Sequence, residues 1–305
     1  MTLRRLAPAK VNLYLHVAAP DARGYHPLRS MVAFADVGDE LQLIPGGKGH
    51  FKIDGPFAEG LSTGEDNLVM KAVRLFEAET GKAGKFFGYR LTKNLPLASG
   101  IGGGSADAGA ILRLLRGSEE ITDEALSAIA ARTGADGVMC LWSKACIAEG
   151  YGEKLSPIVL PALPCVLINP GVECPTPEVF RAYDAIGSHL PIHTRWHGEG
   201  IIPAEMLGER HNMFMTVGGK WPVKDVIDYL TTTRNDLEAP AIALRPVIGD
   251  VLASLRAEPQ TRFARMSGSG ATCFALCDTA TDASLLAGRL RKAWPDAWVQ
   301  ACTLS

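Results

Sequence analysis

Residues 98–111 read ASGIGGGSADAGAI, and this stretch decides how the rest of the chain is interpreted. Gly100, Gly102, Gly103 and Gly104 lead into Ser105, and the apolar residues that follow are spaced as in a helix. Glycine adopts positive φ and lets another group approach its N–H closely, and a helix N-terminus adds free N–H groups and partial positive charge. The stretch therefore predicts an anion cradle, most often one for phosphate.

Two common phosphate-binding loops are excluded by the same residues. A P-loop needs a lysine directly after its last glycine, and none follows here. The dinucleotide fingerprint needs a third glycine where Ser105 stands, and Pro96 lies just before the loop, where a central strand would be weakened. A glycine-rich turn before a helix, with no ligand at all, stays open as the alternative.

The composition is that of a globular protein, and the cysteine usage indicates a cytoplasmic location. The 305 residues suffice for two ordinary domains or one large one, and 47% of them are hydrophobic. The formal net charge is −2 without a basic patch, so nucleic acid is not an expected partner. No run of 18 apolar residues occurs, so no membrane span or membrane partner is expected. The seven cysteines are scattered without a Cys-x-x-Cys motif, which is typical of reduced thiols in a cytosol. We expect a monomer or a weak homodimer.

Hydrophobic periodicity predicts mixed strands and helices in both halves of the chain, which indicates an α+β fold. Strands are expected over 7–19, 29–37, 39–44, 86–92, 140–148, 165–169, 262–266, 272–277 and 297–303. Helices are expected over 66–80, directly after the glycine loop, and over 122–133, 177–185, 224–231, 246–256 and 281–294. Asp66 or Asn67 is expected to cap the helix over 66–80, and Thr122 is expected to cap the helix over 122–133. A cluster of prolines over 157–164 predicts a domain boundary near residue 160.

Residues 186–222 are irregular in composition and receive no assignment. His189, His193 and His197 follow one another at intervals of four residues in this stretch, as metal ligands on one helix face would. Pro191 interrupts the pattern, and no carboxylate or cysteine completes a ligand set. A histidine-bearing loop is the better interpretation.

Three separated motifs resemble the GHMP kinase superfamily, which includes galactokinase, homoserine kinase, mevalonate kinase and phosphomevalonate kinase. They are PAKVNL at 8–13, the glycine loop at 100–107 and MSGSGA at 266–271; GYH at 24–26, GAD at 134–136, Thr176-Pro177 and NDLE at 235–238 also match. The resemblance covers most of residues 7–170 and 235–300. It implies an ATP-binding, ribosomal-protein-like N-terminal domain (1–160), a C-terminal α/β sandwich domain (161–305), and an active site in the cleft between them.

The resemblance also implies the reaction. The branch that matches transfers the γ-phosphate of ATP, with Mg²⁺, to the 2-hydroxyl of CDP-methylerythritol, a small-molecule substrate of the non-mevalonate isoprenoid pathway. Two alternatives stay open: another GHMP small-molecule kinase, of the homoserine or mevalonate type, and a non-catalytic sensor on the same fold. Loss of Lys10 or Asp136 would favour the sensor, and both residues are present.

Site residues are carried over from the resemblance position by position. Lys10 is expected to supply the catalytic cation, and Asp136 the carboxylate that receives the acceptor hydroxyl. The residues expected to bind ATP are Asn67, Lys93, Pro96, Ser99, Gly100, Gly102, Gly103, Gly104 and Ser105. The residues expected to bind the substrate are Asn12, Tyr25, His26, Thr176, Phe180, Gly268, Ser269 and Gly270. Tyr25 and Phe180 would stack on the cytosine, His26 would bond its edge through backbone or ring, and the glycines near 270 would lie beside the diphosphate.

Plainer roles exist for several of these residues. Taken alone, Asp136 is a turn aspartate, Ser105 a helix N-cap and Phe180 a core residue. Asp107 falls in the first turn of the expected helix, where it would repel phosphate, so we expect it to face away and support the loop. Ala106 stands where relatives often carry a second serine, which removes one possible metal contact. The metal ligands are not assigned.

Overall fold

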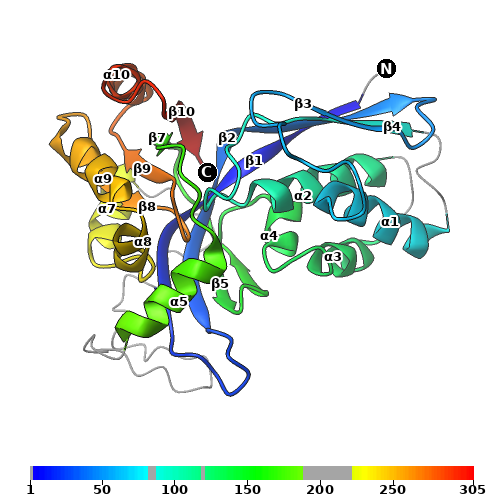
Figure 1. Cartoon of the computed structure of the whole chain (residues 1–305), viewed down its shortest axis with the longest axis horizontal. Helices are drawn as coiled ribbons and strands as arrows, with labels where there is room; N and C mark the ends of the chain where they lie inside the picture. Colours follow the sequence, from blue (N-terminus) through cyan, green and yellow to red (C-terminus); the bar gives the residue numbers. More distant parts are fainter. Residues whose placement is uncertain (1–2, 82–86, 118–120, 188–221) are drawn as a thin grey trace. The chain divides into compact units, whose positions relative to one another are not determined.

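The computed structural model describes residues 3–81, 87–117, 121–187 and 222–305 (Figure 1). Contacts divide the chain into two compact units, and neither is continuous in sequence. Unit 1 consists of Met1–Lys10, Ala35–Leu97 and Gly102–Ser143, and unit 2 of Val11–Phe34, Ala98–Ile101 and Lys144–Ser305. The first strand and the glycine loop therefore each contribute residues to both units. The division into 1–160 and 161–305 stays a prediction.

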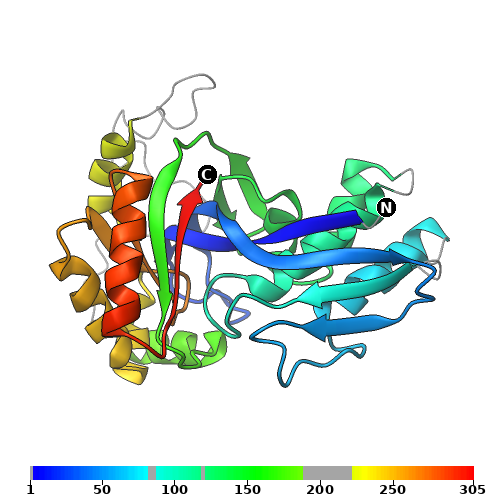
Figure 2. The same ribbon diagram turned by 90° about the horizontal axis from the view of Figure 1, so that it is seen from above.

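Unit 1 combines a small sheet with a group of helices. Its strands are β3 (Phe51–Asp54), β4 (Phe87–Thr92) and the end of β2 (Leu28–Pro45), and its helices are α1 (Leu68–Thr80), α2 (Gly103–Arg116), α3 (Asp123–Ala131) and α4 (Gly137–Trp142). β4 pairs antiparallel with β2 over Glu40–Pro45 and parallel with β3. Figures 1 and 2 show the helices gathered on one side of these strands.

Unit 2 is built around an antiparallel sheet in the order β10-β7-β9-β8. Its strands are the end of β1 (Leu3–Val17), the start of β2, β5 (Cys146–Gly150), β6 (Lys154–Pro157), β7 (Leu163–Asn169), β8 (Phe263–Met266), β9 (Cys273–Leu276) and β10 (Trp298–Leu304). Its helices are α5 (Thr176–Gly187), α7 (Val223–Thr231), α8 (Glu238–Leu244), α9 (Val247–Ala257) and α10 (Ala280–Ala293). α9 and α10 pack on the sheet (Figure 2).

The N-terminal strands of unit 2 form backbone hydrogen bonds with residues that lie far along the chain. Leu28–Val32 of β2 pair with β5, and the backbone N–H and C=O of Phe34 exchange hydrogen bonds of 3.0 Å with Ser305. Leu15 N–H donates to Arg234 O over 3.0 Å. These contacts hold the start of β2 against β5 and Ser305. β1 pairs with β2 and bonds to the segment after α7, which fixes the part of β1 that carries Asn12.

The starts of α1 and α3 have the side-chain caps that the sequence predicts. Asn67 Oδ1 accepts from Val69 N over 2.9 Å at the start of α1, and Thr122 Oγ1 accepts from Ala125 N over 3.2 Å at the start of α3. Both caps confirm the sequence-based expectation, and each stabilises its helix by about 1 kcal/mol.

One predicted strand is partly wrong, and two predicted strands are one. The apolar run over 140–148 begins as the end of α4, turns at Ser143 with φ 47°, and becomes a strand only at Cys146. A short apolar run has no clear period, so helix and strand cannot be separated by pattern. Residues 29–37 and 39–44 form the single strand β2. β3, β6 and α8 were not predicted, and the three histidines over 189–197 lie outside the described residues.

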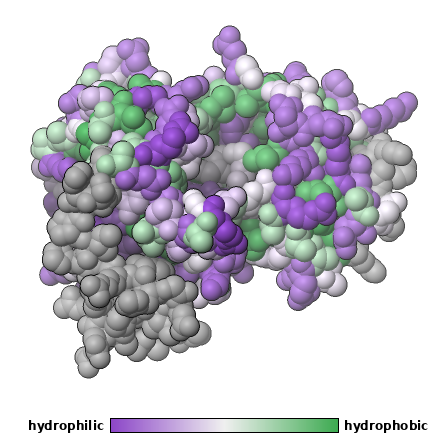
Figure 3. Space-filling view, turned by 60° about the horizontal axis from the view of Figure 1, so that its bottom comes forward, coloured by the Kyte–Doolittle hydropathy of each residue, from purple (hydrophilic) through white to green (hydrophobic). Residues whose placement is uncertain are grey.

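Eight large hydrophobic side chains are exposed among the described residues, and two of them, Tyr25 and Tyr151, lie next to each other. On the face in Figure 3, hydrophilic residues cover much of the described surface and hydrophobic ones form small separate patches. All seven cysteines are buried, and none is in a disulfide. In the part of the chain that the structure describes, no helix combines the length and the apolar character needed to cross a membrane.

Candidate active site

The glycine loop turns directly into α2. Gly102 is the N-cap, with φ 65° and no side-chain cap, and its carbonyl accepts from Ala106 N over 2.9 Å. The backbone N–H groups of Gly103, Gly104 and Ser105 have no acceptor among the described residues. A helix start with open N–H donors and the positive end of the helix dipole attracts an anion. Ser105 is thus the third residue of the helix and not its cap.

Lys10 and Asp136 form an ion pair within unit 1. Lys10 Nζ lies 3.2 Å from Asp136 Oδ2, and the side chains are 8% and 34% exposed. Asp136 occupies the N-cap position of α4, but its side chain does not cap the helix, which leaves Oδ1 without a partner among the described residues. A Cβ placed on Gly102 would lie 3.2 Å from Lys10 Cε. The lysine, the carboxylate and the start of α2 are therefore neighbours, although their motifs lie far apart in sequence.

A buried ionic network supports the first turn of α2 from below. Lys93 Nζ donates to Asp107 Oδ2 over 2.8 Å and also contacts Asp39 Oδ2, and the Lys93 side chain is only 3% exposed. Asp107 Oδ1 is buried with no partner among the described residues. Burial raises the pKa of Asp107 to about 8, an effect that Lys93 opposes. Asp107 therefore faces away from the loop, as expected.

This network gives a structural role to Lys93, which the resemblance places near the adenosine of ATP. A Cβ on Gly103 would lie 3.0 Å from Lys93 Nζ, so the ammonium lies directly under the helix start. Asp39 Oδ1 accepts from Leu95 N over 2.8 Å, which ties the segment before the glycine loop to the same network. Lys93 serves this network and Asn67 caps α1, and a contact of either with a nucleotide stays a prediction.

Two glycine-rich motifs meet within unit 2. Ser267 Oγ donates to Gly100 O over 3.1 Å and accepts from Asn12 N over 3.1 Å. Thr272 N donates to Ser99 O over 3.2 Å. A Cβ on Gly100, whose φ is 74°, would overlap the Ser267 carbonyl and lie 2.8 Å from Gly270 N. Only glycine permits this approach, so the sequence motifs around 12, 100 and 268 form one cluster.

Asn235 and Ser30 complete this cluster, and sequence reasoning missed both roles. Asn235 Nδ2 donates to Met266 O over 2.9 Å and to Gly268 O over 2.8 Å. Asn12 Nδ2 donates to Ser30 Oγ over 2.7 Å. The NDLE segment at 235–238 matched a family motif, so the sequence identified the segment. It did not identify residues 266 and 268 as the partners of Asn235.

Thr176 also reaches the MSGSGA motif at 266–271, which we call the third glycine motif. Its Oγ1 lies 2.9 Å from Ser269 Oγ, and Cys174 Sγ lies 3.2 Å from Ser269 O. These contacts bring the start of α5 to residues 268–270, and the substrate role expected for these residues stays a prediction.

Tyr25 is held in an exposed position by its own loop. Arg23 Nη2 donates to the Tyr151 hydroxyl over 2.7 Å, and that hydroxyl donates to Asp21 Oδ2 over 2.7 Å. Asp21 Oδ1 accepts from Tyr25 N over 3.0 Å. Tyr25 is 64% exposed, and its ring lies 6.1 Å from that of Tyr151 in an edge arrangement. The ring therefore offers a face to a ligand.

His26 is fixed by contacts at both ring nitrogens. Nδ1 lies 2.9 Å from Ala18 O, and since a carbonyl only accepts, Nδ1 carries the proton. Nε2 lies 3.2 Å from Asp184 Oδ1, and the Phe180 ring packs 5.0 Å from the imidazole. Phe180 thus contacts His26, and no ring contact joins it to Tyr25 among the described residues. The main-chain N–H and C=O of His26 have no partner among those residues.

Two family models match this chain, one over the glycine loop and one over the third glycine motif. Residues 67–144 match the family described as GHMP kinases N terminal domain, and residues 225–296 match GHMP kinases C terminal. A 4-diphosphocytidyl-2-C-methyl-D-erythritol kinase of Caulobacter vibrioides (strain NA1000 / CB15N) is 46% identical over 308 residues, which cover 100% of both chains. The enzyme of that name from Bradyrhizobium diazoefficiens is 43% identical and covers 97% of this chain and 96% of its own.

Solved structures agree with these relatives. A crystal structure of 4-(cytidine 5'-diphospho)-2C-methyl-D-erythritol kinase superimposes with a TM-score of 0.72 at 32% identity and covers 99% of each chain. A mevalonate kinase of L. major in complex with R-mevalonate has a TM-score of 0.68 at 16% identity, which shows a shared fold alone.

Proposed function

This chain belongs to the family of 4-diphosphocytidyl-2-C-methyl-D-erythritol kinases within the GHMP kinases, and we propose that Lys10, Asp136 and the glycine loop perform its phosphoryl transfer. The donor is ATP, and the acceptor is the 2-hydroxyl of 4-diphosphocytidyl-2-C-methyl-D-erythritol. The observation that carries the proposal is the Lys10–Asp136 ion pair of 3.2 Å beside Gly102, the N-cap of a helix with open N–H donors.

The start of α2 would receive the phosphates of ATP. Phosphoryl transfer depends on positioning and on stabilisation of charge more than on covalent chemistry. The N–H groups of Gly103, Gly104 and Ser105 point from a helix start, and the absence of side chains at the two glycines leaves room for phosphate oxygens. The Lys93 network beneath them holds this helix start in place.

Asp136 would bind the acceptor hydroxyl through Oδ1, since Oδ2 is already held by Lys10. A carboxylate in hydrogen-bond reach orients the hydroxyl and accepts its proton. The ammonium of Lys10 would place positive charge beside the acceptor oxygen and the transferred phosphoryl group.

Magnesium fits this arrangement as an ion held mainly by the substrate. Mg²⁺ is usually bound through one or two protein oxygens and the phosphates themselves. In the described part of the chain no group of three histidine, cysteine or acidic side chains could hold a metal. The Ser105 hydroxyl has no partner among the described residues and would be the protein ligand nearest the phosphates. The ion would neutralise charge on the transferred phosphate.

The contacts of Tyr25 and His26 support the proposal that the protein recognises the cytidine diphosphate part of the acceptor. The exposed Tyr25 ring would stack on the base, and stacking contributes about 1–3 kcal/mol per base. Both ring nitrogens of His26 are engaged within the protein, so its open main-chain N–H and C=O would read the base. One donor and one acceptor complement the N3 acceptor and N4 donor on the edge of cytosine. Neither mevalonate nor homoserine would use these groups.

The substrate is tested by offering the purified protein, with ATP and Mg²⁺, three alcohols in separate reactions and following ADP release. We expect turnover with 4-diphosphocytidyl-2-C-methyl-D-erythritol and none above background with mevalonate or homoserine. Turnover of either small alcohol at the rate of the CDP-linked one would contradict the role of Tyr25 and His26.

The residue assignment is tested with Asp136→Asn, compared with Asp123→Asn as the control. Asp123 is an exposed helix-start aspartate paired with Arg116 at 2.5 Å, and it lies in the same unit. We expect Asp136→Asn to bind ATP as the wild type does and to lose at least about 100-fold in kcat, the scale of general-base catalysis. The control should keep its kcat. If both variants keep their activity, Asp136 is not the residue that receives the hydroxyl.

A further inference from the structure

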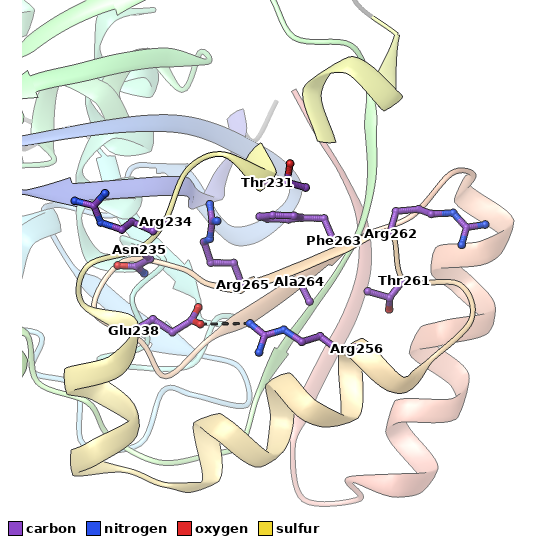
Figure 4. Close-up of a pocket in the computed structure, with 10 residues that line it drawn as sticks. All are labelled: Thr231, Arg234, Asn235, Glu238, Arg256, Thr261, Arg262, Phe263, Ala264 and Arg265. Carbon is purple, nitrogen blue, oxygen red and sulfur yellow. Dashed lines mark hydrogen bonds and ion pairs between the residues drawn. The ribbon is translucent and has the colours of Figure 1, made fainter. Parts of the chain in front are cut away.

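One cavity of unit 2 is lined by residues that directly precede the third glycine motif, and it takes no part in the proposed reaction. It has a volume of about 430 Å³, within the usual range for small-molecule sites. It lies between the end of α7, the start of α8, α9 and β8 (Figure 4). The lining residues are Thr231, Arg234, Asn235, Glu238, Arg256, Thr261, Arg262, Phe263, Ala264 and Arg265.

Arginine dominates the charge of this cavity. Arg234 pairs with Asp236, and Arg262 pairs with Asp278 at 2.6 Å, and in Figure 4 these two side chains extend to opposite sides. Arg256 remains in the middle and reaches Glu238 only at 3.4 Å, in a contact with more than half of the arginine exposed. Such a long, hydrated pair contributes little and is easily exchanged for another anion.

Arg265 adds a positive charge that no carboxylate neutralises directly. Its guanidinium donates to neutral oxygens, among them Leu13 O at 2.9 Å and Thr233 O at 2.6 Å, and lies 4.6 Å from the centre of the Phe263 ring. Burial lowers the pKa of Arg265 to about 10, still well above neutrality, so the group is charged. The arginines of the lining therefore outnumber the carboxylates paired with them.

A neutral donor in the lining is also unsatisfied. Thr261 Oγ1 is buried and has no hydrogen-bond partner among the described residues. A buried hydroxyl without a partner costs free energy, but Oγ1 itself is buried and offers no surface to a ligand in the cavity. The feature of the cavity that suits phosphate oxygens is therefore its excess positive charge.

We propose that this cavity is a binding site for the phosphate or diphosphate group of a small organic phosphate, and that its occupation is transmitted to the third glycine motif. Arg256 would bind the anion directly in exchange for Glu238. The Phe263 ring would contact the organic part of the ligand.

The route to the glycine motif consists of two short contacts. Glu238 Oε2 accepts from Met266 N over 3.0 Å, and Asn235, which also lines the cavity, donates to Met266 O and to Gly268 O. An anion that binds Arg256 would break the contact of Arg256 with Glu238. The Glu238 carboxylate also accepts from Met266 N, so this loss would affect the end of β8. The residues directly after that strand end are Ser267–Gly270, which are expected beside the substrate diphosphate.

The test is a calorimetric titration of the whole protein with inorganic diphosphate, with ADP and CDP present at saturation so that both nucleotide subsites are filled. We expect one binding event with a Kd on the order of 1 mM or tighter. Arg256→Gln should weaken it by about tenfold or more, the scale of a charge-assisted hydrogen bond. Glu238→Gln should tighten it, because the competing negative charge is gone. Arg289→Gln is the matched control, since Arg289 pairs with Glu258 at 2.9 Å with 54% exposure and lies outside the cavity.

Binding that is absent, or equally strong in Arg256→Gln and the wild type, would overturn the site. A Glu238→Gln variant that binds diphosphate no better than the wild type would overturn the charge exchange. The transmission has its own readout: diphosphate should change the KM for the CDP-linked substrate in the wild type and in Arg289→Gln, and not in Arg256→Gln. An unchanged KM in the wild type, with diphosphate bound, would overturn the transmission.

Discussion

Replacement of Lys93 by methionine should destabilise unit 1 severely, because it removes the cation from a buried network. Lys93 is 3% exposed, and its two carboxylate partners, Asp39 and Asp107, are 0% and 4% exposed in their side chains. Methionine keeps the length of the side chain and removes the charge. The two acidic groups then face each other with no counter-ion and with little water near them.

The expected loss follows from this burial. Removing one partner of a buried ion pair costs about 3–5 kcal/mol, a large part of the ~5–15 kcal/mol by which a domain is usually stable. Arg74→Met is the control, because Arg74 pairs with Glu65 at 2.8 Å in the same unit with side chains 42% and 83% exposed. The control should lose less than about 1 kcal/mol.

Unfolding in urea, followed by circular dichroism at several pH values, measures both free energies. The pKa of Asp107 is already raised to about 8 by burial, and loss of Lys93 raises it further. A carboxyl with a raised pKa in the folded state stabilises the protein most below its unfolded pKa, about 4, and loses that contribution as pH rises. Up to about pH 8, Asp107 stays protonated in both folded proteins, so its contribution to the deficit is the same. The deficit of Lys93→Met should therefore grow above about pH 8, where the wild type ionises Asp107 and the variant continues to lose stability.

A loss below about 1 kcal/mol, equal to that of Arg74→Met and independent of pH, would refute this account of the network. Asp107→Asn combined with Lys93→Met gives a second check, since the double variant should recover part of the stability. The same protein separates two roles of Lys93. A structural role leaves the KM for ATP of the folded fraction unchanged, whereas the predicted contact with adenosine raises it.

Gly100→Ala should lower the free energy of unfolding by about 1–3 kcal/mol and reduce activity, because the new Cβ would overlap the Ser267 carbonyl at a positive φ. Gly60→Ala is the control, since Gly60 has a φ of 78° and open space around it, so urea unfolding of this variant measures the effect of φ alone. Tyr25→Ala should raise the KM for the CDP-linked substrate by about 5- to 100-fold in steady-state assays, and Tyr25→Phe should not. The raised pKa of Asp107 makes the unfolding free energy of the wild type decrease between about pH 4 and pH 8. In Asp107→Asn this decrease should be smaller. An unchanged pH profile would contradict this.

The sequence predicted the local elements of the site well, because local rules determine them. The glycine run before an apolar helix predicted α2 and its open N-terminus, and Thr122 predicted the start of α3. The exact start of α2 was missed by two or three residues, since Gly102 serves as the cap where Ser105 offered a side-chain cap. Capping by backbone conformation leaves a weaker signal in sequence than capping by a hydroxyl.

Contacts between distant segments were beyond the reach of residue patterns. Nothing in the sequence around Lys93 distinguishes a lysine that neutralises Asp39 and Asp107 from one that binds a ligand. The bond from Asn235 to Gly268 likewise joins segments that only the tertiary fold brings together. The partnership of Lys10 with Asp136 was expected only through the family resemblance, because no spacing rule connects the two positions.

The interleaving of the two units sets an order of events during synthesis on the ribosome. Every segment of unit 1 has been made once Ser143 is added, whereas unit 2 needs residues from Val11 to Ser305. The nascent chain therefore holds Asn12 for most of translation before its partner Ser267 exists, and Phe34 waits until Ser305. The helix start that we propose for phosphate binding can form early. The segments that we propose for base and diphosphate recognition belong to unit 2, whose segments are complete only after β10 has been made, so the two parts of the proposed site form at different stages of synthesis.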